Sequence, residues 1–212
     1  MRIQRCNKCE VLLKENFDYC PYCGNKCDQY HISYKIGDKG PAGGIVFFDK
    51  GTRSHGWQYL EAALCDVTNV FGSAGSLNIP TYKDIGKGKE NTATIISDFI
   101  HTAVQLCANY TVNGYDDWFL PSEGELDLMY HNLKENGLGN FVDEHYWSST
   151  QVETGDHGEE ELVAYDDSGE CYEETLREAN LKYWTSFINF SNGIHLIGGK
   201  MVASRARPIR AF

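Results

Sequence analysis

The sequence predicts an α+β fold with a small cysteine-rich module in front of it. Three observations lead to this: two close pairs of cysteines near the N-terminus, two stretches of helical hydrophobic spacing in the middle, and short strand-like runs on both sides of them. At 212 residues, the chain is long enough for one ordinary domain and a small appendage. We therefore expect a module over residues 1–28 and a single larger domain over residues 34–212.

The N-terminal module is expected to bind a metal. Cys6 and Cys9 are separated by two residues, Cys20 and Cys23 likewise, and ten residues lie between the two pairs. Two such turns direct four thiolates at one point, which closes a tetrahedral shell and leaves no open position for chemistry. We expect a structural zinc ion in a zinc ribbon, with a rubredoxin-like iron site or paired disulfides as alternatives. Cys27 lies outside this pattern.

The first elements of the larger domain are expected to be strands. An apolar run over residues 45–48 follows the turn-forming sequence GDKGPAGG and ends before Asp49 and Gly51, and a second strand is expected within residues 56–64. The glycines of the turn are not expected to hold a phosphate, because no Gly-Lys-Ser/Thr sequence follows them.

Two helices are expected next. In NTATIISDFIHTAVQLCAN, apolar residues recur at helical spacing, and Asn91 or Thr92 is suited to cap the helix. The second helix begins with a capping box, Ser122 with Glu125 three residues later, and is expected to stop at Gly137. The rest of the chain is strand- and loop-like.

Charge is distributed unevenly. Of the net charge of −11, −10 comes from residues 151–180, where eleven acids face one arginine. We interpret residues 151–182 as a solvated acidic insertion rather than a calcium site, because they lack a recognisable loop spacing. The absence of a basic face argues against nucleic-acid binding by the main domain. No stretch reaches transmembrane length, and no signal peptide is visible. We therefore expect a cytoplasmic protein, or a virion component if the gene is phage-encoded.

Several phrases occur together in one order: IGDKGPAGGIVFFDKG, GWQYLEAA, DIGKGKENTATII, NGYDDWFLPSEGELDLMY, YWSST and FINFSNG…RARPIRAF. In this order they resemble the family of bacterial and viral domains known as the Lcl C-terminal or DUF1566 domain, over residues 34–150 and 183–212. The resemblance implies a C-type-lectin-like fold with two helices and a small antiparallel sheet in which the termini pair. It also implies that the C-terminal arginines fork onto carboxylates, with Asp116 and Asp117 as candidates, and that Phe212 is buried.

Some members of this family are variable proteins of diversity-generating retroelements, in which codons of a C-terminal segment are mutated at adenines. The segment here matches the pattern NFxNGxxxxxxKxxxxRxRPxRAF that is typical of these proteins. We name the residues that match its specified letters the frame residues: Asn189, Phe190, Asn192, Gly193, Lys200, Arg205, Arg207, Pro208, Arg210, Ala211 and Phe212. The resemblance implies a ligand-binding display protein without catalysis, whose ligand is an unknown protein or carbohydrate.

The residues between the frame residues, together with nearby aromatic and hydroxyl side chains, are the expected ligand surface, and their side chains are expected to be accessible. These display residues are Trp147, Trp184, Ser186, Phe187, Ser191, Ile194, Leu196, Ile197, Gly198, Gly199, Val202, Ala203 and Ser204. In the family, the unmutated segment typically carries asparagine at the positions between the frame residues. Met201 does not fit this origin, because methionine cannot be reached from an asparagine AAC codon by changing adenines alone. The alternative is that Ile194, Leu196 and Ile197 are core residues of a buried strand.

Two other functions remain open from the sequence. DDWFLPSEGEL also resembles the equivalent turn and helix of formylglycine-generating enzymes, whose chemistry needs a reactive cysteine pair. Cys65, Cys107 and Cys171 fit that role poorly, since Cys107 lies on the apolar stripe of a helix, where a thiol is normally inert. The other possibility is an adaptor that acts through its zinc ribbon.

Overall fold

The computed structural model describes residues 4–6, 8–13, 19–26, 33–71, 79–96, 102–151, 163–165, 171–173 and 184–212. It divides the chain into two compact units, Met1–Lys35 and Ile36–Phe212. In the first unit, β1 (Gln4–Arg5) pairs antiparallel with β2 (Leu12–Leu13), and Tyr19 forms an isolated antiparallel bridge with Lys26. Cys27, His101 and most of the acidic insertion lie outside the described residues.

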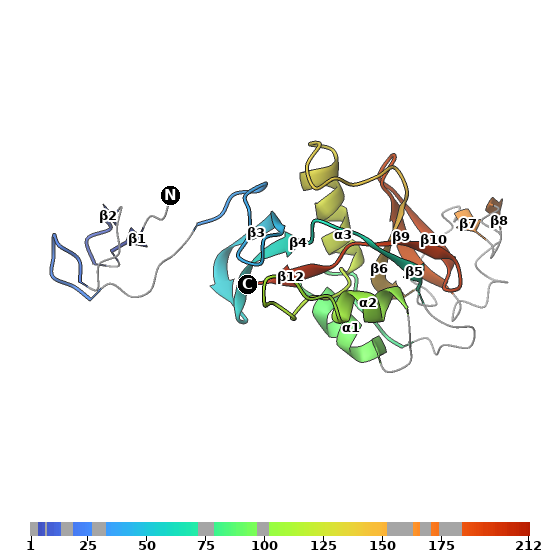
Figure 1. Ribbon diagram of the computed structural model, residues 1–212, viewed down its shortest axis with the longest axis horizontal. Coiled ribbons are helices and arrows are strands. Elements are labelled where there is room, and N and C mark those ends of the chain that lie inside the picture. The colour runs from blue at the N-terminus through green and yellow to red at the C-terminus, as the bar shows by residue number, and fades with distance from the viewer. Residues whose placement is uncertain are drawn as a thin grey trace. The chain divides into compact units, whose positions relative to one another are not determined.

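The second unit is built around a five-stranded mixed sheet in the order β10-β9-β6-β11-β5. All of its pairings are antiparallel except that between β11 and β6. The strands are β5 (Val67–Val70), β6 (His145–Gln151), β9 (Trp184–Asn189), β10 (Ile194–Gly199) and β11 (Ala203–Ala206). The C-terminal segment thus supplies three of the five strands, and Figure 1 shows two of them, β9 and β10, in red and orange at one end of this unit.

A second sheet joins the two ends of this unit. It has the order β12-β4-β3, with β3 (Ile45–Ser54), β4 (Trp57–Ala62) and β12 (Ile209–Ala211), all antiparallel. The expected strands at 45–48 and 56–64 are therefore confirmed. Phe212 continues the pairing, because its N–H donates to the Tyr59 carbonyl at 3.0 Å and its carbonyl accepts from Tyr59 N at 3.1 Å. Its ring is only partly buried and stacks on Tyr59 with centroids 5.5 Å apart.

The helical region differs from the expectation in its first half. One helix starting at Asn91 or Thr92 was expected, whereas the structure has α1 (Gly88–Ile95) and α2 (Ala103–Ala108), and Thr102 is an extended N-cap that interrupts a continuous helix. Asn91 and Thr92 lie inside α1 rather than capping it. Their side chains bond the backbone of Tyr82 and Leu120, which fastens α1 to two neighbouring loops.

The second helix agrees with its sequence signals. Ser122 and Glu125 form the predicted capping box at the start of α3 (Glu123–Met129), which continues as a π-helix, η2 (Tyr130–Lys134). Gly137, with φ +68°, ends it: Leu138 N donates to Leu133 O at 2.9 Å and Gly137 N to Lys134 O at 3.0 Å, the pattern of a Schellman motif.

The five-stranded sheet is covered on both faces. One face packs on a core of α3, η2 and the three-stranded sheet, in which Tyr146, Ile188 and Phe190 are buried. The other face packs on α1 and α2 through Trp147 and Phe187, among others. In Figure 1, α3 lies above the sheet and α1 and α2 lie below it. The unit is thus α+β, as predicted, and its five-stranded sheet is larger than the small sheet that was expected.

Two short strands are described within the acidic insertion. β7 (Val163–Tyr165) and β8 (Cys171–Glu173) pair antiparallel with each other, and β7 lies beside β10, the outer strand of the five-stranded sheet. In the described part of the chain, none of the helices combines the length and the apolar character needed to cross a membrane.

Candidate functional site

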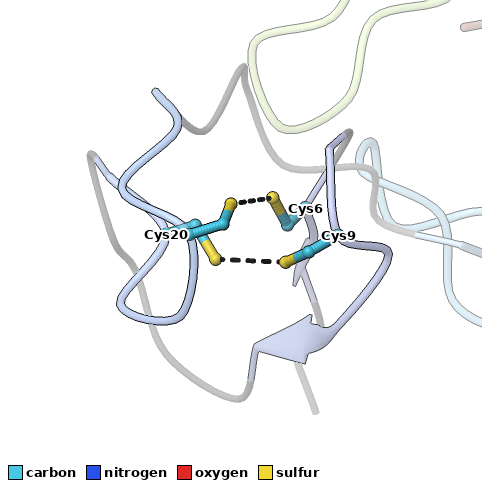
Figure 2. Close-up of side chains that lie close together, drawn as sticks. Cys6, Cys9 and Cys20 are labelled. Carbon is cyan, nitrogen blue, oxygen red and sulfur yellow. Dashed lines mark hydrogen bonds between the residues drawn. The ribbon is translucent and has the colours of Figure 1, made fainter.

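Four cysteines of the first unit converge on one point. Two loops present them, one carrying Cys6 and Cys9 and the other Cys20 and Cys23, and the four sulfur atoms all lie within 4.8 Å of one another. Cys6 Sγ is 3.4 Å from Cys23 Sγ, and Cys9 Sγ is 3.6 Å from Cys20 Sγ, so each contact joins one loop to the other (Figure 2). The four cysteines therefore form a cluster that could hold a metal ion.

The surroundings of the cluster favour the thiolate form of Cys6. Backbone N–H groups of Cys9 and Lys8 lower the pKa of Cys6 to about 6, and Lys8 N lies 3.4 Å from Cys6 Sγ. Donors placed around a sulfur in this way stabilise its negative form, which is the form that binds a metal. Against backbone hydrogen bonds that lower them, burial and the neighbouring sulfurs raise the pKa of Cys9 to about 12 and raise that of Cys23. The only apolar neighbours packed with the four cysteines in the described residues of this unit are Val11 and Leu13.

The second candidate site is the C-terminal segment, where the frame residues shape and anchor the backbone. In the β9–β10 turn, Asn189 Oδ1 accepts from Ser191 N at 2.9 Å, and Asn192 Oδ1 accepts from Ile194 N at 3.0 Å. Gly193 has φ +76°, and a Cβ there would overlap the ring of Tyr130. These residue types are therefore required by the turn itself.

Two of the three arginines anchor the segment on Asp66. Arg207 is buried, and it donates from Nε to Asp66 and from Nη1 to the carbonyls of Ala63 and Gly139, at 2.9 and 2.7 Å. Arg205 is more exposed; it forks onto Glu144 at 2.6 and 3.2 Å and reaches Asp66 Oδ2 at 3.4 Å. Neither of these carboxylates was foreseen, because they come from distant parts of the sequence.

Arg210 joins the segment to the glycine-rich loop. It forks onto Asp117 at 2.7 and 3.0 Å, as expected, and its Nη1 donates to Glu61 Oε1 at 2.9 Å. Asp116, the other candidate, is exposed. Glu61 is completely buried and also accepts from the backbone N–H groups of Ala42 and Gly44 at 3.2 and 3.0 Å. The loop of GDKGPAGG therefore wraps an internal carboxylate.

The expected accessibility of the display residues is wrong for many of them. Trp147 and Phe187 are 1% and 3% exposed, and both belong to the core over α1 and α2. They are inward-facing residues of central strands, so they meet the helices rather than solvent. Five further display residues are also buried: Trp184, Ser186, Leu196, Ile197 and Gly198. For Leu196 and Ile197, the alternative of core residues is the correct one.

The remaining display residues are at least partly exposed. Ile194 is 53% exposed, and Ser191 and Ala203 are also exposed. Three others are partly exposed: Gly199, Val202 and Ser204. The structure therefore separates the predicted surface into a buried part and an accessible part that includes the β9–β10 turn and the strand β11.

Strand pairing brings some accessible residues into one line across the sheet. Ile194 pairs with Asn189, Asn189 pairs with His145, and Ser204 pairs with Asn69. Ser204 also donates to the His145 carbonyl at 3.2 Å, which joins the two halves. We call these five residues the sheet-crossing row. Ile194 is exposed and the other four are partly exposed.

The sheet-crossing row lies on the same face as the buried aromatics. Side chains two residues apart on a strand share a face. This relation holds between Trp147 and His145, between Phe187 and Asn189, and between Leu196 and Ile194. The His145 ring lies 4.9 Å from the Phe187 ring. With strands about 4.8 Å apart, five strands give a strip roughly 19 Å wide, comparable to a small ligand-contact surface. His145 and Asn69 were missed from the sequence, since only the register reveals them.

Two thiols of the second unit differ in exposure. Cys107 is buried in the α1–α2 core, and burial raises its pKa well above the usual range, whereas Cys65 is exposed. The inert character expected of Cys107 is thus supported by its surroundings. The side chain of Cys171 lies outside the described residues.

Among known proteins, no family model matches the chain, and no curated protein matches it significantly.

Proposed function

We propose that the second unit is a ligand-binding display domain on a C-type-lectin-like scaffold, and that its contact surface is the sheet-crossing row with the adjacent turn. The observation that carries this proposal is that one short segment combines buried anchoring residues with accessible ones. Arg207 and Arg210 are buried and paired with carboxylates. Ile194 and Ser204, which precede them in the segment, are at least partly exposed and belong to the sheet-crossing row. Such a combination allows side chains to change on a fixed backbone.

Exposed apolar side chains support contact with a partner. Ile194 at 53% exposure sits beside polar, partly exposed Asn189 and His145, a mixture suited to protein or carbohydrate recognition. The buried aromatics beside the row on the same face, Trp147 and Phe187, pack against each other with ring centroids 5.3 Å apart and hold the row rigidly. A rigid contact surface lowers the entropic cost of binding. No step of catalysis is part of the proposal.

The first experiment is a binding comparison on glycan and peptide arrays. The full chain, Ile194→Asp and Ser204→Arg would be probed beside a control, Lys89→Asp, which changes an exposed residue of α1. We expect capture by the unaltered chain and by the control, and loss of capture by both row variants. The proposal fails if no probe is captured, or if capture survives both row substitutions.

We also propose that the metal of the first unit is zinc and that its role is structural. Four thiolates suit a tetrahedral ion, and a closed set of four protein ligands leaves no position for a substrate. Zinc, when bound, would tie the two cysteine loops together in a unit whose described core consists of the four cysteines with Val11 and Leu13. Elemental analysis of the purified chain should give about one zinc per molecule; iron in its place, or no metal after growth with zinc, contradicts the assignment.

A further inference from the structure

One histidine ties the β9–β10 hairpin to helix α3. His195, on β10, has Nδ1 3.1 Å from Glu123 Oε1 and Nε2 2.9 Å from Asp127 Oδ1. The two carboxylates are four residues apart on α3, so they lie one above the other and face the two nitrogens of one ring. His195 is adjacent in sequence to Ile194, the most exposed member of the sheet-crossing row.

The geometry fixes the charge of this ring. A neutral imidazole has one N–H donor and one acceptor nitrogen, whereas an ionised carboxylate can only accept. A ring that bonds carboxylates through both nitrogens must therefore donate from both, which requires the protonated form. The protonated ring thus forms a charge-assisted hydrogen bond with each of the two carboxylates, Glu123 and Asp127.

We propose that His195 is a positioning residue, a cationic clasp that holds the β9–β10 hairpin on α3 and loosens that hairpin when the ring loses a proton. The consequence for ligand binding rests on the proposed function, because it assumes that the row carried by the hairpin is the contact surface. The clasp itself concerns only β10 and α3.

The ionisable groups around the clasp lie in one chain of contacts. Besides Glu123 and Asp127 on α3, His131 of η2 has Nε2 3.6 Å from Asp127 Oδ1 and Nδ1 2.9 Å from Glu135 Oε2. The neighbour of His195 across the strand pair is Ile188, which carries no charge. The clasp thus faces two acids directly, and His131 competes for only one of them.

The direction of the pH response follows from these contacts. Hydrogen bonding to Glu123, and then to Asp127, raises the pKa of His195 to about 9, against the opposing effect of burial. Because the pKa in the folded state lies above the ordinary value near 6.5, the clasp is complete below that value and is lost as the pH rises through about 9.

The test is an NMR titration of the full chain with labelled histidines, combined with amide hydrogen exchange. The His195 ring should titrate near pH 9, and Glu123→Gln and Asp127→Asn should each lower that midpoint while leaving a histidine to observe. His195→Gln should speed exchange of the Leu196 amide at pH 7 by about fivefold, and the control His131→Gln should not.

A His195 ring that titrates at or below pH 6.5, or unchanged exchange in His195→Gln, overturns the clasp. If His195→Gln does not fold, the midpoints of the two carboxylate variants decide, since both retain the histidine. No ligand enters these measurements, so their failure is separable from a failure of the array experiment.

Discussion

Removal of Arg210 is expected to destabilise the second unit far more than removal of its neighbour Arg205. Arg210 is 5% exposed and is the cation that balances Glu61, which is completely buried. In Arg210→Ala, the Glu61 carboxylate would keep only the N–H groups of Ala42 and Gly44. A buried charge that loses its counterion is costly because water cannot reach it.

The magnitude follows from the burial of each pair. Breaking a buried ion pair by removing one partner costs about 3–5 kcal/mol, and the Glu61 pair belongs to this class. Arg205 is the matched control: its side chain is 29% exposed, its bidentate partner Glu144 is 57% exposed, and Asp66, which it also reaches, keeps its pair with Arg207. Exposed pairs are worth about 0–1 kcal/mol. We therefore expect the two alanine variants to differ by roughly 2–4 kcal/mol.

Urea unfolding followed by tryptophan fluorescence measures both variants, since Trp118 and Trp147 are buried in this unit. A double-mutant cycle with Glu61→Gln adds a second readout: the cost of Arg210→Ala should fall once the buried charge is gone. If Arg210→Ala and Arg205→Ala lose the same stability within about 0.5 kcal/mol, the buried-anchor interpretation is refuted.

Three further outcomes are expected. Phe187→Ala should cost about 3–5 kcal/mol in urea unfolding, whereas Ile194→Ala should change stability by less than about 0.5 kcal/mol; equal effects would contradict the assigned burial. Replacing Cys20 and Cys23 by serine should abolish metal binding in elemental analysis and unfold the first unit by NMR; retained metal would rule out the four-cysteine site. Arg210 lowers the pKa of Asp117, so the stability from this pair is present above the ordinary pKa near 3.9 and is lost as the pH falls below it. In Asp117→Asn, the free energy of unfolding should therefore decrease less steeply as the pH is lowered through this range. An unchanged dependence on pH would count against the pair.

The sequence predicted correctly those features that depend on residues close together in the chain. The capping box of Ser122 and Glu125, the stop at Gly137 and the convergence of the cysteine pairs all depend on residues a few positions apart. In each case, the backbone hydrogen bonds or the ligand spacing are fixed by the local chain.

Long-range pairing could not be predicted in the same way. The partners of Arg205 and Arg207, Glu144 and Asp66, lie 61 and 141 residues away in sequence from the arginine that bonds each one. The burial of Leu196 depends on which face of β10 meets the helices, and a shift of one residue would reverse it. Asn91 and Thr92 look like caps by type, yet they bond loops that pack against the helix.

The same limit applies to the candidate surface. The resemblance to variable proteins suggested that the residues between the frame residues would all be accessible, but a strand within a sheet alternates its side chains between two faces. Here both faces of the sheet are covered, so the display residues that remain accessible are those in turns, at strand ends and in the sheet-crossing row. His145 and Asn69 join Ile194 and Ser204 there through register alone.

The most direct measurement of the central claim is deep sequencing of this gene and its flanking DNA from a natural population. A diversified display surface predicts substitutions at adenine positions in codons such as those of Ile194 and Ser204, with the codons of Arg207 and Arg210 unchanged, and a nearby copy of the segment that differs at adenines. Substitutions spread evenly over the gene, or a C-terminal segment that is invariant and has no such copy, would contradict it.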